Sequence, residues 1–127
     1  MSVHPQAIDY RTLSGPSLVA FFKICDSWRL SDHESRLLLG CCPTLTQFAM
    51  WRARPYEAEL DPPTIKRISY LLSIFKALPR YLTQGAMVSK WLRLPATEAI
   101  VNRQTPLDYM LTATADDLRA LLITVAN

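Results

Sequence analysis

The chain has 127 residues, half of them hydrophobic, and its 14 basic and 11 acidic residues leave a net charge of +3. This length fits one domain or two very small ones, and high hydrophobic content with low net charge excludes an intrinsically disordered chain. No apolar stretch approaches the ~20 residues of a membrane span, and Met1–Tyr10 lacks a secretory pattern, so the sequence predicts a soluble cytoplasmic protein.

The hydrophobic positions follow helical spacing, so the sequence predicts an all-α protein. Residues 1–15 are expected to form a flexible N-terminal arm, because Met1–Leu13 shows no periodicity. The first helix is expected to begin near Pro16 or Ser17. Its core-facing stripe has three- and four-residue spacing and comprises Leu18, Phe21, Phe22, Cys25 and Trp28.

Two short helices are expected next, joined by a turn. Ser31 and Glu34 match a capping box, and Gly40 suits a left-handed helix stop. The following helix is expected over Thr44–Arg52 and is closed by Pro55. Its inward residues are expected to be Leu45, Phe48, Ala49 and Trp51.

The longest predicted helix begins with Asp61 as N-cap and Pro62 in the first turn, and Pro79 should end or kink it. Its apolar stripe comprises Ile65, Ile68, Leu71, Leu72, Phe75 and Leu78. A boundary follows, so the predicted domains are residues 16–83 and 84–127.

The second segment is expected to hold three short helices. One carries Met87, Val88, Trp91 and Leu92 and stops before Pro95. Another begins at Thr105, which precedes a proline, and the last begins at Thr114 and runs to the C-terminus.

The short helices flanking Gly40 predict a helix-turn-helix arrangement, in which Thr44–Arg52 would be the recognition helix. Arg52 and Arg54 would then lie near DNA phosphates. The exposed side chains of that helix would be Thr44, Thr46, Gln47 and Met50. The alternative is a helical packing or dimerisation unit that never touches DNA, since phosphate binding usually requires a denser basic face.

Several motifs in order resemble the Xre/MbcA/ParS antitoxin family. They are Leu30–Gly40 (LSDHESRLLLG), Phe48–Arg52 (FAMWR), Arg67–Leu78 (RISYLLSIFKAL), Trp91–Pro95 (WLRLP) and Thr105–Met110 (TPLDYM). The resemblance covers residues 28–127. The chain departs from the family at Ala96, where asparagine is usual, at Arg103, where glycine is common, and at Met50, where a basic residue is usual.

The resemblance implies a non-enzymatic antitoxin of a type II toxin–antitoxin module, with an Xre-type N-terminal domain and a small helical toxin-binding domain. Its partner would be a RES-domain toxin that degrades NAD+ or transfers ADP-ribose from it, whose active-site entrance the C-terminal domain covers. The N-terminal half would form a homodimer within a toxin–antitoxin hetero-oligomer and often repress its own operon by binding operator DNA.

Residues of the second segment are candidates for toxin binding. Arginine can form forked contacts with carboxylates, tyrosine combines area with a hydroxyl, and the chain end carries no charge after Arg119. These candidates are Arg93, Arg103, Tyr109, Ile123, Thr124, Val125, Ala126 and Asn127. Leu118–Leu122 fits either core or interface, and Trp91 fits a core position better than a contact.

Other functions find less support. Three cysteines, two of them adjacent, do not form a disulfide framework, and the chain has only two histidines, so neither a metal site nor any other cofactor is predicted. No catalytic constellation is recognisable. The alternative function is a stand-alone helix-turn-helix transcriptional regulator, which would bind operator DNA without a partner protein.

Overall fold

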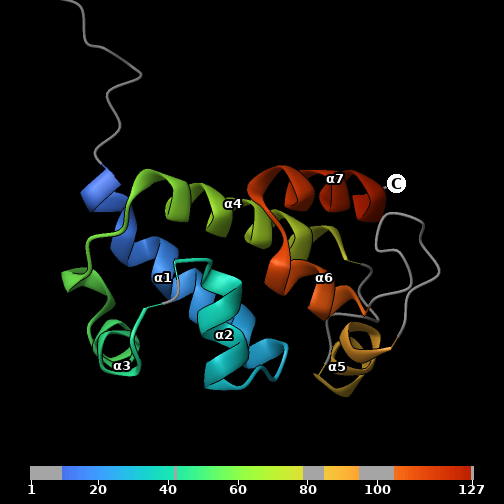
Figure 1. Cartoon of the computed structure of the whole chain (residues 1–127), viewed down its shortest axis with the longest axis horizontal. Coiled ribbons are helices and arrows are strands. Elements are labelled where there is room, and N and C mark those ends of the chain that lie inside the picture. Colours follow the sequence, from blue (N-terminus) through green and yellow to red (C-terminus); the bar gives the residue numbers. More distant parts are fainter. Residues whose placement is uncertain (1–9, 42, 79–84, 95–104, 127) are drawn as a thin grey trace, which may run out of the picture.

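The computed structural model describes residues 10–41, 43–78, 85–94 and 105–126 (Figure 1). Within these ranges the chain forms helices and no strand, which confirms the all-α prediction. None of the described helices is both long and apolar enough to cross a membrane. The elements are α1 (Tyr10–Ser27), α2 (Asp32–Leu39), α3 (Leu45–Ala53), the 3-10 turn η1 (Pro55–Glu57), α4 (Pro62–Ala77), α5 (Gly85–Arg93), α6 (Pro106–Thr112) and α7 (Ala115–Ala126).

The predicted helix starts are confirmed where side chains cap the backbone. In each case an oxygen of the capping side chain accepts a hydrogen bond from the backbone N–H three residues later, which satisfies a donor that the helix leaves unpaired. These capping residues are Ser31, Thr44, Asp61, Thr105 and Thr114. The predicted stop is also confirmed, because Gly40 ends α2 with a φ of 90°.

The predicted start of the first helix is wrong, because α1 begins at Tyr10 and carries Pro16 in its interior. Tertiary contacts hold this extra part in place. The buried Ser14 accepts a hydrogen bond from Leu60 N at 2.9 Å, and Gly15 lies directly under the Tyr56 ring. The arm prediction is therefore wrong from Tyr10 onward, whereas residues 1–9 lie outside the described part of the chain.

The core lies where α4 crosses between α1 and α7 (Figure 1). The predicted stripe of α1 is buried, and so is most of the stripe of α4, whose Leu72 and Phe75 are half-buried. Buried residues of α5, α6 and α7 join the same cluster, namely Leu92, Leu107, Met110, Leu118 and Leu121. The predicted domain boundary falls among residues 79–84, outside the described residues, and stays a prediction.

A buried arginine of α4 ties the two segments together. Arg67 Nε donates to Leu38 O at 2.7 Å, its Nη2 donates to Met110 O at 2.9 Å, and its Nη1 donates to Ala113 O. These carbonyls belong to the C-terminal ends of α2 and α6, where helix dipoles place partial negative charge. The guanidinium therefore fixes both helix ends against α4.

Candidate functional site

Two surfaces contain the residues predicted to bind partners, and the first is formed by α3. The turn before α3 is held by Arg36, whose Nε donates to Pro43 O at 2.9 Å. The helix itself is anchored by Phe48, which is buried and meets Phe22 of α1 edge-on at 5.4 Å between ring centroids. One side of α3 is thus fixed on α1, and the opposite side faces solvent.

Arg52, predicted to lie near a phosphate, forms contacts within its own chain. Its Nη1 lies 3.4 Å from Asp26 Oδ1, and its Nη2 lies 3.9 Å from Asp32 Oδ1. Its guanidinium carbon also lies 4.6 Å from the centroid of the Phe22 ring, within the range of a cation–π interaction. The charge of Arg52 is therefore neutralised locally, and its side chain packs α3 onto α1.

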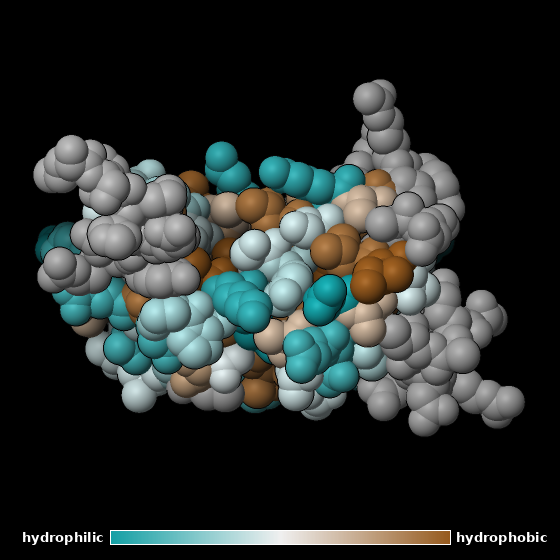
Figure 2. All heavy atoms as spheres, turned by 90° about the horizontal axis from the view of Figure 1, so that it is seen from above, coloured by the Kyte–Doolittle hydropathy of each residue, from teal (hydrophilic) through white to brown (hydrophobic). Residues whose placement is uncertain are grey.

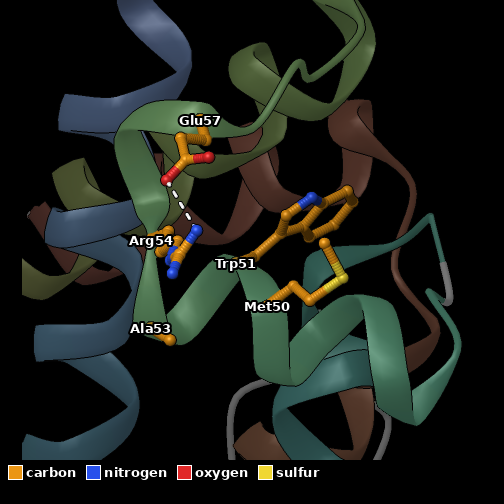
Figure 3. Close-up of a pocket in the computed structure, with 5 residues that line it drawn as sticks. All are labelled: Met50, Trp51, Ala53, Arg54 and Glu57. Atoms are coloured by element: carbon orange, nitrogen blue, oxygen red, sulfur yellow. Dashed lines mark ion pairs between the residues drawn. The ribbon is translucent and has the colours of Figure 1, made fainter.

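Arg54, the second predicted phosphate ligand, is exposed but also has an acidic neighbour. Its Nη1 lies 3.6 Å from Glu57 Oε2 (Figure 3). The two residues line a cavity of about 210 Å³, and its other walls are Met50, Trp51 and Ala53. This cavity lies at the C-terminal end of α3 and has a largely apolar lining with an ion pair at its edge.

The outward side of α3 is more apolar than the sequence pattern indicated. Thr44, Thr46, Gln47 and Met50 are exposed as predicted, although Thr44 Oγ1 is occupied as the helix cap. Leu45 and Ala49, which the spacing predicts to point inward, are both exposed. The exposed fraction of Leu45 is 62%, close to the 63% of Met50. The inward assignment was wrong because apolar spacing alone does not show which side of a short helix meets the core.

The second surface belongs to the C-terminal segment, and its first predicted residue is bound internally. Arg93 of α5 forms a forked ion pair with Glu34 of α2, with distances of 2.8 Å from Nη1 to Oε2 and 3.0 Å from Nη2 to Oε1. The hydrogen bond from Arg93 is the main reason that the pKa of Glu34 falls to about 2. The same carboxylate accepts from Ser31 N, so Arg93 joins α5 to the capping box of α2.

Tyr109 of α6 is half-buried and lies against the start of α7. Its hydroxyl donates to Asp117 O at 3.3 Å, and burial raises its pKa. Trp91 packs against the core, in agreement with the core interpretation. Both aromatic side chains hold the small helices together, and Tyr109 leaves part of its ring accessible.

One side of α7 packs into the core and its other side is exposed. Leu118 and Leu121 are buried, Leu122 is half-buried, and Ile123 is 55% exposed. Thr124 donates its hydroxyl proton to Ala120 O at 3.1 Å. Figure 2 shows hydrophobic residues interspersed with polar ones over α4 and α7, with more of them toward the end of α7.

The structure leaves part of the predicted toxin-binding set undescribed. Val125 and Ala126 belong to α7, although their side chains are not described, and Arg103 and Asn127 lie outside the described residues. Within the described part of the chain, Arg93 is paired with Glu34 of α2, Tyr109 donates to Asp117 O of α7, and Ile123 is exposed on α7. None of the described cavities is lined by these three residues, so the structure does not gather them into one pocket.

The described residues contain no cluster of three histidine, cysteine or acidic side chains that could hold a metal ion. Cys25 is buried in the core, and burial raises the pKa of its thiol to about 12. A thiol of this kind is protonated at neutral pH and is a poor nucleophile.

The chain is similar to a distant relative among known proteins. The chain is 38% identical over 78 residues to the uncharacterized protein y4oB of Sinorhizobium fredii, a stretch that covers 61% of this chain and 58% of that protein. The chain thus spans less than two thirds of the length of this relative. No protein-family model and no solved structure matches the chain.

Proposed function

We propose that this protein is the antitoxin of a type II toxin–antitoxin module and that it neutralises a RES-type toxin through its C-terminal segment. The observation that carries the proposal is the exposed Ile123 at the end of α7, a helix whose other side is fixed in the core. The family resemblance supplies the class of toxin. Neutralisation would consist of covering the entrance of the toxin's active site.

The construction of α7 suits a protein that blocks a pocket. The Thr114 hydroxyl and the Asp117 carboxylate cap each other's backbone N–H groups at 3.2 Å and 3.0 Å. Two acidic residues in the first turn complement the helix dipole. Because the helix is ordered before binding, little conformational entropy is lost when its end enters a concave surface.

We assign different tasks to the predicted contact residues. Arg93 is already bound to Glu34, so we assign it to hold α5 against α2 rather than to reach a toxin carboxylate. Ile123, with the residues that follow it, supplies apolar area, and the accessible part of Tyr109 extends the contact. These assignments match the usual composition of protein–protein interfaces, in which an apolar centre is surrounded by polar residues.

The first experiment identifies the partner. The full chain is tagged at its N-terminus, so that Asn127 stays free, and is purified from its native host under gentle conditions. Mass spectrometry should find a RES-type protein in stoichiometric amount. Recovery of the chain without such a protein, under conditions where the toxin gene is expressed, would contradict the proposal.

The second experiment tests the surface by substitution. Ile123→Asp should weaken toxin binding and abolish neutralisation in a growth assay, because a charge at a desolvated position opposes association. Leu45→Asp is the matched control, since Leu45 is similarly exposed but lies on α3. Truncation should begin after Leu122, because a cut after Arg119 would also remove Leu121 from the core. A truncated chain that still neutralises would overturn the C-terminal mechanism.

A DNA-binding regulator is the second candidate function. Thr46 and Gln47 favour it, because both are exposed on α3 and glutamine can pair with an adenine edge. The internal pairing of Arg52 and Arg54 opposes it, since both would have to exchange partners to bind phosphates. Salt-dependent binding of the isolated chain to its own promoter, lost in Gln47→Ala, would support the regulator.

A further inference from the structure

We infer that the side chain of Arg29, at the end of α1, binds a carboxylate of the protein partner. The inference rests on the proposed function, which makes that partner a toxin, and it adds a second contact to the one assigned to Ile123. The sequence predicts such a carboxylate contact for Arg93, but the guanidinium of Arg93 is occupied by Glu34. Arg29 is the exposed arginine beside it.

Arg29 has a backbone conformation that favours glycine. Its φ is 55°, and among the described residues it alone has a positive φ without being a glycine. Two hydrogen bonds close the end of α1 around it, from Leu30 N to Cys25 O at 3.0 Å and from Arg29 N to Asp26 O at 3.2 Å. These two bonds form a Schellman motif, in which the left-handed residue is usually glycine because a Cβ makes this conformation unfavourable. Gly40 adopts the left-handed conformation at the end of α2, so the arginine at the end of α1 needs another explanation.

The side chain of Arg29 is exposed and has no partner within the described part of the chain. It takes part in none of the ion pairs or hydrogen bonds that the described residues form. The acidic side chains close to it in the sequence pair with other arginines instead. These pairs are Asp26 and Asp32 with Arg52, and Glu34 with Arg93. The guanidinium of Arg29 is therefore available to a group outside the chain.

The turn that holds Arg29 is joined to the end of α5. Arg93 Nη2 donates to the carbonyl oxygen of Arg29 at 3.3 Å, so α5 lies against this turn (Figure 1). The residue that follows Arg93 is Leu94, which is 59% exposed. Arg93 thus links an exposed arginine to a helix end that carries an exposed leucine. Arginine and apolar side chains are both frequent in protein–protein contacts.

The charges around Arg29 favour a single carboxylate over a nucleic acid. The side chains of Asp26 and Asp32 are 72% and 73% exposed, so a polyanion approaching the turn would be repelled by both. Arg29 also follows the C-terminal end of α1, where the helix dipole adds partial negative charge. One carboxylate, by contrast, can accept two parallel hydrogen bonds from a guanidinium. The ligand that fits is therefore an exposed aspartate or glutamate of a protein.

The position of this turn is compatible with the contact proposed for α7. Figure 1 shows that α5 and the end of α7 lie toward the same end of the long axis of the molecule, whereas α3 lies toward the other end. Arg29 is held beside α5, and Ile123 lies near the end of α7. One toxin can therefore contact both residues.

The first test measures the affinity of the full chain for the purified RES-type toxin by calorimetric titration. Arg29→Gly should raise the dissociation constant by about tenfold, because a carboxylate of the toxin loses its charged partner in the contact. Arg29→Ala should raise it equally, which separates the loss of the guanidinium from the introduction of a glycine. Arg29→Lys should keep part of the affinity, since it retains the charge but not the paired donors.

The matched control is Lys23→Gln, which removes one positive charge from another exposed position of α1. It should leave the affinity unchanged. Equal weakening by Arg29→Gly and Lys23→Gln would show that the net charge of the chain, rather than one contact, determines the affinity, and would overturn the inference.

A second test separates binding from stability. Arg29→Gly should raise the midpoint of urea denaturation by about 0.5 M, because glycine adopts the left-handed conformation without a Cβ, whereas Arg29→Ala should not raise it. The more stable variant should thus bind the toxin less tightly than the wild type does. The competing explanation is that the arginine stabilises α1 through the helix dipole. Arg29→Gly would then lower the midpoint and leave the affinity unchanged, and this result would refute the inference.

The two proposals fail separately. If Ile123→Asp abolishes neutralisation and Arg29→Gly binds the toxin as tightly as the wild type, the proposed function stands and the contact of Arg29 is refuted. If the chain recovers a protein that is not of the RES type and Arg29→Gly weakens that complex, the contact stands and the antitoxin function is refuted. If the chain recovers no protein and Arg29→Gly weakens binding to promoter DNA, Arg29 contacts a phosphate and both proposals are refuted.

Discussion

Replacing Arg67 tests the interaction that joins the two segments of the chain. Arg67→Met keeps much of the side-chain volume but removes the donors to Leu38 O, Met110 O and Ala113 O. A hydrogen bond from a charged donor contributes about 1.5–3 kcal/mol, and a buried acceptor left without a donor costs about 1–3 kcal/mol. Because such losses overlap within one network, we expect the free energy of unfolding to fall by about 3–5 kcal/mol.

The assay is urea denaturation followed by circular dichroism at 222 nm. With a urea dependence of about 1–3 kcal/mol per molar, a loss of this size lowers the midpoint by more than about 1 M. Arg67→Lys should give an intermediate loss, because one ammonium cannot reach carbonyls on two separate helix ends.

The control for Arg67 is the neighbouring exposed cation. Lys66→Met removes a charge from the same helix without removing a buried donor, so it should change stability by no more than about 0.5 kcal/mol. If Arg67→Met and Lys66→Met shift the midpoint equally, the buried guanidinium does not stabilise the fold and the reasoning fails.

Three further predictions follow from local geometry. Gly40→Ala should cost at least about 1 kcal/mol in a urea titration, because φ is 90° and the new Cβ would lie 2.6 Å from Arg67 Cδ. The pKa of Glu34 is lowered from 4.5 to about 2, so its ion pair stabilises the fold above pH 4.5 and loses that effect as the pH falls toward 2; the stability difference between wild type and Arg93→Met should shrink over this range. Cys25 should resist thiol reagents in the native chain at pH 8 and react after unfolding, as mass spectrometry of labelled peptides would show.

Features set by a few neighbouring residues could be predicted from the sequence. The Ser31 capping box, the Asp61 cap and the left-handed Gly40 all depend on side chains within four positions of the backbone groups that they satisfy. The buried stripe of α1 could also be predicted, because its hydrophobic residues are spaced by three and four positions and therefore lie on one side of the helix.

Features that depend on distant residues could not be predicted. Arg67 binds carbonyls 29, 43 and 46 positions away, so no local pattern marks it as buried. Arg52 looked like a phosphate ligand because its acidic partner Asp26 lies on another helix. The spacing predicts Leu45 to be inward because it lies three residues before Phe48, whereas in the structure Phe48 is buried against α1 and Leu45 is exposed.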